Sequence, residues 1–371
     1  MIKVCHMTSA HGEEDVRIFH KECVSLAKVG YDTYLVERGE SREKDGVHIV
    51  GVGEISQSRR KRMTEGAKKI YEAAKAVDAE IYHFHDPELL PYGMKLKQAG
   101  KKVIFDSHEF YREQLREKEY LPAWLRACVA TGYGAYENHV LRHCDAVISP
   151  CTLNGKSFFE NRCRRVAIIS NAAILGEFFD LYDPNTPKED RQVCYVGGLT
   201  EARGISADIK AAYQANAVIA LAGSFSPEGY GETLKKMPEY ACVRHLGSID
   251  RRGVRELLGE SRVGLCTLLD IGQYLKIDTF GIKVYEYMSM ALPVILSHSS
   301  YNDRMVDRYH FGICVDPSNV DEIADAIRYL LDHPDEARQM GENGRRAVKE
   351  EFNWGVEEKK LFALYEEILQ G

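Results

Sequence analysis

Long apolar runs are missing from the 371 residues of this chain. The longest candidates, such as residues 217–223, fall well short of the ~18 residues that a membrane-spanning helix needs. The first fifteen residues carry one Lys and turn polar at once, which argues against a secretory signal. The ten cysteines form no Cys-x-x-Cys pair, so neither a zinc ribbon nor a redox pair is indicated. We therefore expect mostly buried thiols in a reducing compartment and a cytoplasmic protein.

A large excess of positive charge is also absent. The formal net charge of −7 argues against a general nucleic-acid binder. The charge is unevenly distributed, because residues 1–170 hold 27 basic and 24 acidic side chains, a balance of +3, which leaves −10 for residues 171–371. The two halves of the chain are therefore expected to face different partners.

Short β-branched runs alternate with amphipathic stretches along most of the chain, which predicts parallel βαβ units. The pattern pauses at 165–192 and then restarts. We expect an α/β fold of two doubly wound, Rossmann-like domains that face each other across a ligand-binding cleft. The predicted strands are 2–7, 32–37, 79–85, 101–107, 145–150, 193–198, 217–222, 242–246, 262–267, 292–297 and 312–315. The predicted helices are 15–30, 59–77, 122–143, 204–215, 230–236, 251–260, 282–290, 301–308, 319–332, 334–351 and 355–369.

The loop after the first strand, TSAHGEEDVR at 8–17, lacks Gly-x-Gly-x-x-Gly, which disfavours a dinucleotide site of the usual kind. Asp15 is expected to cap the following helix, and Gly12 to allow a tight turn. A simple capped helix start and a loop that faces a bound ligand are equally compatible with this pattern.

Ionisable residues crowd two further strand ends, HFHDPE at 83–88 and DSHE at 106–109. His83 and His85 share one strand face, as do Asp106 and His108. The four could be metal ligands of a hydrolase, but further ligands at a recognisable spacing are lacking. We favour the edge of an active site over satisfied core histidines.

Two segments of the second half are suited to bind a phosphate. GGLTEARG at 197–204 follows a predicted strand, so Gly197 and Gly198 allow backbone amides to approach an anion, and Arg203 can pair with a diphosphate. In DTFGIKVYEYMSMALPVI at 278–295, Asp278 and Glu286 flank a Phe-Gly turn that opens a helix. Their carboxylates can accept hydrogen bonds from sugar hydroxyls, although acidic residues near a helix start are common without a ligand.

These segments, taken in order, resemble the retaining glycosyltransferases of family four, which have the GT-B fold. The family carries Glu-x-Phe-Gly-x-x-x-x-Glu before a helix and a Pro-Val-Ile strand, and this chain has DTFGIKVYE followed by ALPVI. VCYVGGLTEARGI, FGICVDPSNVDEIADAIRYLL and MGENGRRAVKEEFNW extend the resemblance to most of the chain. It implies an acceptor domain at 1–170, a donor domain at 171–354 and a final helix, 355–371, that packs back on the first domain.

The resemblance implies that the chain moves a sugar with retention from a UDP-, GDP- or dTDP-linked donor to a saccharide or lipid-linked acceptor. It implies a role in capsule, exopolysaccharide or other cell-surface glycan synthesis, with no cofactor and no metal ion, in keeping with the lack of Asp-x-Asp. The implied catalytic residues are His108, Asp278 and Glu286. The implied donor-binding residues are Gly197, Gly198, Arg203, Phe280, Gly281, Ile282, Lys283 and Glu286, and those on the acceptor side are Gly12, Asp15, His85, Asp86 and Glu109.

Two positions depart from the family pattern. Asp278 replaces the first Glu, and Gly198 replaces the usual Arg of the phosphate loop, so Arg203 and Lys283 must supply the positive charge. The alternatives are a nucleotide-sugar epimerase of the same fold, a non-catalytic binding subunit and the metal hydrolase considered above.

A basic segment lies at 58–75, with seven basic and two acidic side chains. A solvated helix face and a peripheral contact with anionic lipid are both compatible with it. The second alternative would bring the protein to the inner face of the plasma membrane.

Overall fold

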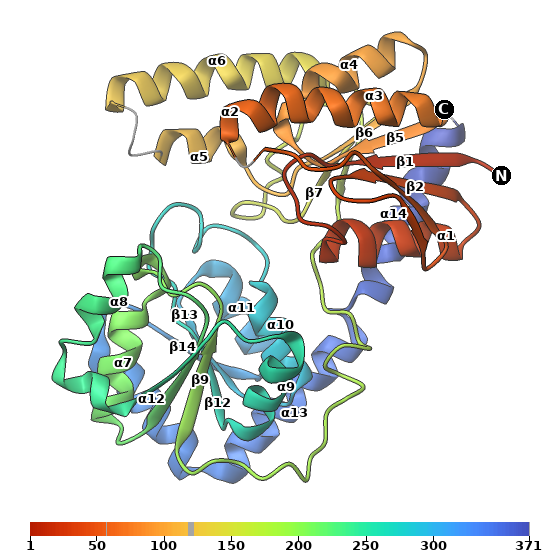
Figure 1. Ribbon diagram of the computed structural model, residues 1–371. Coiled ribbons are helices and arrows are strands. Elements are labelled where there is room, and N and C mark those ends of the chain that lie inside the picture. Colours follow the sequence, from red (N-terminus) through yellow and green to blue (C-terminus); the bar gives the residue numbers. More distant parts are fainter. Residues whose placement is uncertain (57, 118–121, 371) are drawn as a thin grey trace. The chain divides into compact units, whose positions relative to one another are not determined.

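The computed structural model describes residues 1–56, 58–117 and 122–370. The chain divides into two compact units: unit 1 comprises Met1–Asn171 and Gly355–Gly371, and unit 2 comprises Ala172–Trp354. The boundary expected between residues 170 and 171 lies one residue from this one. Each unit contains a largely parallel sheet flanked by helices (Figure 1), which confirms the predicted α/β class with two doubly wound sheets.

The sheet of unit 1 has the strand order β3-β4-β2-β1-β5-β6-β7-β8. All neighbouring pairs are parallel except β3 and β4. The strands are β1 (Lys3–Met7), β2 (Asp32–Glu37), β3 (Arg42–Lys44), β4 (Val47–Gly51), β5 (Ile81–Phe84), β6 (Lys102–Asp106), β7 (Ala146–Ser149) and β8 (Val166–Ile168).

The helices of unit 1 begin with η1 (Val16–Cys23), a π-helical segment that continues into α1 (Val24–Lys28). Asp15 caps η1 as predicted, because its carboxylate accepts hydrogen bonds from the backbone N–H groups of Arg17 and Ile18. The remaining helices are α2 (Arg59–Lys61), η2 (Arg62–Gly66), α3 (Ala67–Val77), η3 (Pro87–Leu89), α4 (Leu90–Gln98), α5 (Tyr111–Glu117), α6 (Ala123–Leu141) and α14 (Trp354–Gln370).

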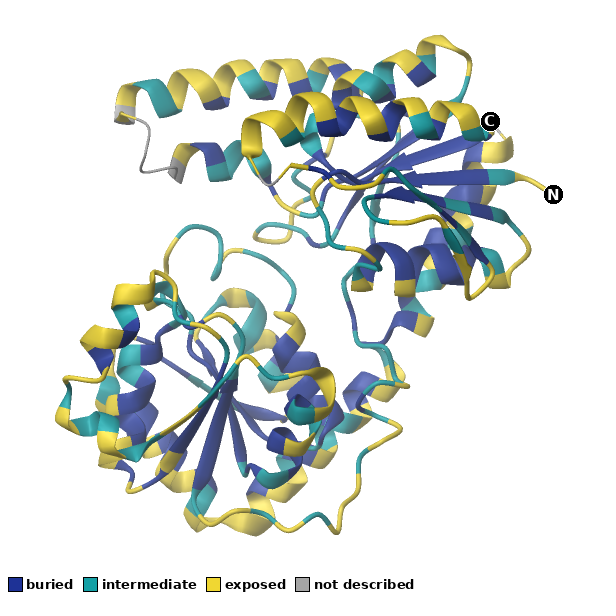
Figure 2. Ribbon diagram, viewed as in Figure 1, coloured by how far each residue is buried: buried dark blue, intermediate teal, exposed yellow. Residues whose placement is uncertain are grey.

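The sheet of unit 2 is parallel throughout, in the order β11-β10-β9-β12-β13-β14. Its strands are β9 (Gln192–Val196), β10 (Val218–Ala222), β11 (Val243–Gly247), β12 (Val263–Cys266), β13 (Val294–Ser297) and β14 (Gly312–Val315). Its helices are η4 (Glu201–Arg203), α7 (Ile205–Gln214), α8 (Glu228–Leu234), η5 (Pro238–Cys242), α9 (Arg251–Glu260), α10 (Ile282–Ser289), α11 (Ser300–Tyr309), α12 (Val320–Asp332) and α13 (Pro334–Glu350). Figure 2 shows the strands of both sheets as mostly buried.

Several elements were not predicted. β3 consists of three charged residues at the edge of the sheet, so it has no hydrophobic period, and β8 lies in the segment that we expected to be a connection. The sequence of α4 contains Pro91 and Gly93, which weaken a helical pattern. In the structure Pro91 lies in the first turn, where proline is tolerated, and the absent side chain of Gly93 leaves room for the Phe84 ring.

The cysteines are mostly buried, as expected: six of the ten are buried and only Cys128 is exposed. Among the described residues, no helix is both long enough and apolar enough to cross a membrane.

Candidate functional site

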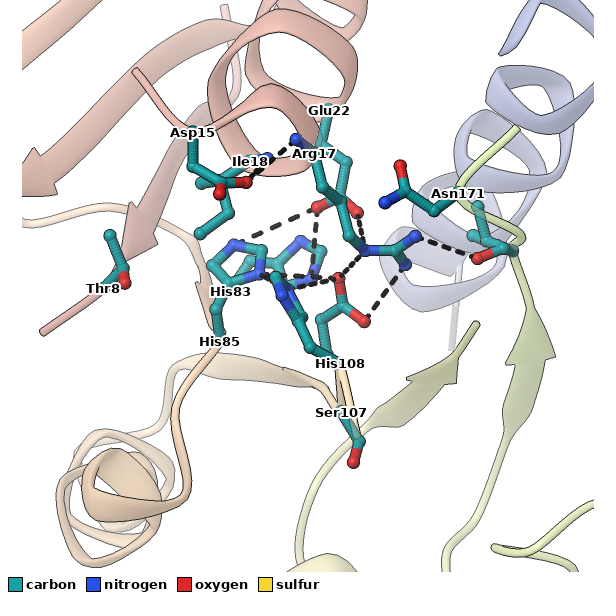
Figure 3. Close-up of polar contacts among 12 residues, drawn as sticks. Thr8, Asp15, Arg17, Ile18, Glu22, His83, His85, Ser107, His108 and Asn171 are labelled. Atoms are coloured by element: carbon teal, nitrogen blue, oxygen red, sulfur yellow. Dashed lines mark hydrogen bonds and ion pairs between the residues drawn. The ribbon is translucent and has the colours of Figure 1, made fainter. Parts of the chain in front are cut away.

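Polar side chains gather at the carboxyl ends of three neighbouring strands of unit 1. β1, β5 and β6 are adjacent and parallel, so the residues that end or follow them leave the sheet at one edge. Figure 3 shows side chains from this edge pointing toward those of η1. The structure thus brings His83, His85, Asp106 and His108 together, as the strand pattern predicts.

His108 is the most accessible member of this group. Its Nε2 lies 3.0 Å from Nδ1 of His85 and 3.3 Å from Oδ2 of Asp106. The side chain of His108 is 16% exposed, whereas those of His85 and Asp106 are fully buried. Burial lowers the pKa of His85 to about 4, so this imidazole is neutral at pH 7. Of His83, His85, Asp106 and His108, His108 is therefore the residue that a molecule from solvent can reach.

Arg17 holds Asp106 in place. Its Nε and Nη2 donate hydrogen bonds of 2.8 and 3.1 Å to the two carboxylate oxygens of Asp106, and its Nη1 donates to the carbonyl of Ile169. Burial alone would raise the pKa of Asp106, but the charges of Arg17 and His108 hold it well below its usual value. Asp106 is therefore an ionised acceptor that can orient the imidazole of His108.

Asp86 fixes the loop after β1. Its Oδ2 accepts hydrogen bonds from Thr8 Oγ1 and from the backbone N–H groups of Ser9 and Ala10, at 2.8, 2.6 and 3.1 Å. Its Oδ1 lies 3.1 Å from Nδ1 of His11. Burial would raise the pKa of Asp86, but these hydrogen bonds hold it well below its usual value. The Asp86 carboxylate thus positions the loop that was expected to meet the acceptor.

The other residues expected on the acceptor side lie apart from this cluster. Gly12 lies in the loop after β1 without a left-handed backbone conformation, whereas Glu14 has one, with φ of 51°. The carboxylate of Glu14 accepts hydrogen bonds from Arg42 and Lys44, and these contacts stabilise the turn. Glu109 is exposed and accepts a hydrogen bond from Gln114.

In unit 2, two glycine loops pack against each other at the carboxyl ends of β9 and β10. Gly197 has φ of +130° and Gly223 has φ of +145°, which favour glycine. A Cβ atom on Gly223 would lie 1.9 Å from the carbonyl oxygen of Gly197. Around Gly198 a Cβ atom would meet no other atom within 4 Å, so the backbone of this loop faces open space.

Lys283 lies under this glycine loop. Its Nζ donates a hydrogen bond of 2.6 Å to the Tyr195 hydroxyl and would be 3.1 Å from a Cβ atom on Gly197. Lys283 is only 8% exposed, and burial lowers its pKa to about 8, with the nearby charge of Arg203 acting in the same direction. Arg203 ends η4, and its guanidinium lies 5.4 Å from the ring centre of Tyr274. Two cationic groups therefore accompany the loop.

At the start of α10, a buried aromatic side chain is followed directly by exposed backbone. The Phe280 ring is buried and packs edge-on against Tyr301 and Phe352, with ring centres 5.0 and 5.6 Å away. Gly281 is the N-cap, no side chain in the described structure caps the helix there, and Ile282 is 47% exposed. The first N–H groups of α10 are thus available to an anion.

Two carboxylates of unit 2 are paired with arginine. Glu286 is buried and its Oε1 accepts a hydrogen bond of 2.7 Å from Nη1 of Arg251, while Nη2 of Arg251 binds Glu177. Asp278 is 8% exposed, and its Oδ1 lies 3.9 Å from Nη2 of Arg304. Glu286, Lys283 and the start of α10 belong to one helix, so these groups share a fixed spacing.

Residues 180–347 match the family model described as glycosyl transferases group 1. Part of unit 2 is thus similar to the group 1 glycosyl transferases. The matched segment includes every residue that was expected to bind the donor. It also includes the glycine loop, Lys283 and the start of α10.

Curated relatives agree with this match over short segments. An MMP alpha-(1->4)-mannosyltransferase of Mycolicibacterium hassiacum is 32% identical over 95 residues, which are 25% of this chain and 23% of that protein. A GDP-mannose-dependent alpha-(1-6)-phosphatidylinositol monomannoside mannosyltransferase of Mycobacterium tuberculosis is 32% identical over 90 residues, 24% of this chain and 23% of that protein. The aligned part of the chain thus spans about a quarter of the length of these relatives.

Solved structures show the same fold over the whole chain. The sucrose-phosphate synthase of Thermosynechococcus elongatus has a TM-score of 0.78 at 18% identity and covers 100% of both chains. The Anabaena protein HepE, in complex with UDP and glucose, has a TM-score of 0.73 at 13% identity and covers 99% of this chain and 100% of its own. The chain therefore has the same fold as these two proteins.

Sequence reasoning missed several residues of unit 2. Arg251 opens a surface helix, and its pairing with Glu177 and Glu286, at sequence separations of 74 and 35, needs the folded chain. Asp208 of α7 is fully buried next to Thr267, and burial raises its pKa to about 7. The burial of an acidic residue of this kind cannot be predicted from the hydrophobic pattern of the sequence.

Proposed function

We propose that this protein is a glycosyltransferase that moves a hexosyl group from a nucleoside-diphosphate sugar to a saccharide or lipid-linked acceptor, with retention of anomeric configuration. The observation that carries this proposal is the set of groups around Gly197–Gly198. Open backbone, two cations and an uncapped helix start lie within the segment that matches the glycosyl transferases group 1 model. Such a set suits a diphosphate.

In this proposal the donor is held by carboxylates and by backbone amides. Glu286 binds the ribose hydroxyls, and Arg251 fixes its carboxylate for that purpose through the hydrogen bond to Oε1. Asp278 binds hydroxyls of the donor sugar. The backbone at 280–282 and at Gly197–Gly198 lies against the pyrophosphate.

The leaving group is a nucleoside diphosphate, whose negative charge grows as the glycosidic bond breaks. We propose that Arg203, Lys283 and the first N–H groups of α10 stabilise this charge in the place of a metal ion. Lys283 is suited to this role because its desolvated ammonium gains more from an anion than an exposed one would.

Unit 1 would bind the acceptor at the edge where His108 is accessible. Asp106, held by Arg17, orients His108 so that an imidazole nitrogen can receive a hydrogen bond from the acceptor hydroxyl. Retention then follows from attack on the face that the diphosphate leaves, with the departing phosphate accepting the proton of the acceptor hydroxyl.

A lipid-linked acceptor would place the enzyme at the inner face of the plasma membrane, in the synthesis of a capsule or another cell-surface glycan. The basic segment 58–75 supports this part of the proposal. Lys61, Lys68, Lys69 and Lys75 are exposed along α2 and α3, and each basic residue near an anionic surface adds about 1 kcal/mol of attraction. Absence of sedimentation with anionic vesicles at low salt would refute membrane contact without affecting sugar transfer.

The test of the proposed activity has two stages. A thermal-shift panel of UDP-, GDP- and dTDP-sugars and free nucleoside diphosphates identifies the donor, since a ligand at 100 times its Kd stabilises the fold by about 2.7 kcal/mol. The bound donor is then incubated with and without saccharide or lipid-linked acceptors. Transfer that requires an acceptor supports the proposal. Conversion of the donor without any acceptor would indicate an epimerase, and no shift across the panel would contradict donor binding.

A further inference from the structure

Three histidines and a glutamate converge in the core of unit 1, behind His108. His6 comes from β1, His83 and His85 from the end of β5, and Glu22 from η1. The relative exposure of these residues is 0% for His6, Glu22 and His83 and 1% for His85. The proposed transfer reaction uses His85 only through His108 and leaves the other three residues without a role.

Glu22 and His83 present inward-facing atoms without a hydrogen-bond partner, whereas His6 Nδ1 lies 3.0 Å from His85 Nε2. Oε2 of Glu22 lies 3.9 Å from Nδ1 of His6, 3.8 Å from Nε2 of His83 and 3.9 Å from Nε2 of His85. Neither carboxylate oxygen of Glu22 nor Nε2 of His83 has a hydrogen-bond partner among the described residues. A buried carboxylate without such partners is costly, so its environment calls for a cation or a proton.

The outward-facing ring nitrogens, in contrast, are all held. The Tyr365 hydroxyl of α14 lies 2.9 Å from Nδ1 of His83 and 3.3 Å from Nε2 of His6. Nδ1 of His85 is 3.4 Å from Oδ2 of Asp106. Metal-binding histidines have this arrangement, because the second ring nitrogen is held by a carboxylate or another polar group while the first faces the ion.

The charges around the cluster leave room for one divalent cation. Arg17 Nε lies 3.2 Å from Oε1 of Glu22, but its hydrogen is directed at Asp106. Arg17, Glu22 and Asp106, all ionised, carry a net charge of −1, which a divalent ion would change to +1. The ion would therefore replace one uncompensated buried charge with another of opposite sign, but it would satisfy the four inward-facing ligand atoms.

We propose that His6, His83, His85 and Glu22 bind a divalent first-row transition metal, with zinc as the best match. Three imidazole nitrogens and one carboxylate oxygen suit zinc, whereas magnesium and calcium prefer oxygen ligands. Zn–N bonds of about 2.0–2.1 Å place tetrahedral ligand atoms about 3.3–3.4 Å apart, so Glu22 would move inward by a few tenths of an ångström. A closed, fully buried set of four ligands makes the site structural rather than catalytic.

This metal site is independent of the metal-free donor chemistry proposed above, because it lies in unit 1 and touches neither Arg203 nor Lys283. It does depart from the expectation that the chain binds no metal ion. The competing arrangement is a metal-free cluster in which Glu22 keeps a proton and His6 Nδ1 hydrogen-bonds His85 Nε2, 3.0 Å away.

The experiment uses the full-length protein without a histidine tag, purified from zinc-supplemented medium and from cobalt-supplemented minimal medium. We expect close to one equivalent of zinc by elemental analysis. We also expect visible absorption bands of four-coordinate Co²⁺ in the cobalt form. Less than one tenth of an equivalent of either metal, and no cobalt bands, would overturn the proposal in favour of the protonated cluster.

Variants assign the metal to this cluster. Glu22→Gln keeps the side-chain shape and should lower the metal content at least tenfold, as should His83→Gln. His298→Gln is the matched control, because His298, Asp303 and Cys314 form a more exposed group that could hold an ion, and His85, Asp106 and His108 form a third. Loss of metal from the control alone would refute the proposal. If the Glu22 and His83 variants fail to fold, the cobalt bands of a His108→Gln/His298→Gln protein decide, since of the three groups found among the described residues only the buried cluster then keeps all its ligands.

Discussion

The ammonium of Lys283 both donates a 2.6 Å hydrogen bond to the Tyr195 hydroxyl and lies 3.9 Å from the centre of the Tyr195 ring. The contact joins α10 to β9 directly below the glycine loop. Because Lys283 is buried, its charge is held by few partners and is sensitive both to pH and to a bound anion.

Lys283 should make nucleoside diphosphate binding depend on pH. Burial lowers its pKa to about 8, so the group is cationic below this pH and neutral above it, and the cation is the form that attracts a phosphate. The affinity should therefore fall by up to tenfold per pH unit as pH rises through 8, in calorimetric titrations between pH 7 and 9.5. Lys283→Met should bind about 10- to 100-fold more weakly at pH 7 and lose this pH dependence. A variant with unchanged affinity would exclude Lys283 from the site.

Glu286 should contribute to the affinity for the donor, whereas Glu177, which pairs with the same arginine, should not. Glu286→Gln weakens a charged hydrogen bond to ribose, worth about 1.5–3 kcal/mol, so the Kd of the nucleoside diphosphate should rise about 10- to 100-fold. Glu177→Gln is the matched control, because Glu177 pairs with the same Arg251 but has no predicted donor contact. Equal losses in the two variants would show that Arg251, rather than Glu286, determines binding.

Asp208 should make the free energy of unfolding of unit 2 decrease as pH rises. Burial raises its folded-state pKa to about 7, above an unfolded value of about 3.9. Its stabilising contribution is complete below pH 4 and is lost as pH rises to 7, by about 1.4 kcal/mol per pH unit. Asp208→Asn should remove this slope and become increasingly more stable than the wild type between pH 4 and 7 in urea unfolding. The exposed Glu228→Gln variant should follow the wild type, and an unchanged slope in Asp208→Asn would contradict the assignment.

Arg17 should be essential for the stability of unit 1. Arg17→Met leaves the buried Asp106 without its cation, which should lower the free energy of unfolding by about 3–5 kcal/mol. Arg42→Met, which breaks partly exposed ion pairs with Glu14 and Glu37, should cost about 1 kcal/mol or less. The double variant Arg17→Met/Asp106→Asn should recover part of the loss in chemical unfolding. Strict additivity of the two changes would show that the ion pair is not responsible.

The arrangement of the strands could be predicted because the fold depends on patterns that are local in sequence. Apolar runs such as IKVCHM predicted the parallel strands, and the same pattern predicted that His85 and His108 follow the ends of neighbouring strands. β3 and α4 were missed because their residues contradict the local propensity, and contacts such as the pairing with β4 and the packing of Gly93 against Phe84 form only in the folded chain.

The candidate sites could be predicted only in part. Gly197, Lys283 and Glu286 lie in short segments whose spacing is informative. The role of Arg251 could not be predicted, because a charged residue on an amphipathic helix normally faces solvent. The cluster around Glu22 was invisible for a related reason, since η1 brings a carboxylate to histidines about 60 positions later only once the sheet has formed.

The position of Tyr365 near the C-terminus determines when the core of unit 1 can be completed during synthesis. Its hydroxyl contacts His83 and His6, which precede it by 282 and 359 residues. Unit 2 lies between these partners in sequence and is complete when α14 leaves the ribosome. The first half of the chain therefore cannot form these contacts until the last helix has been synthesised. A chain released before residue 365 would lack the hydroxyl group that contacts His83 and His6.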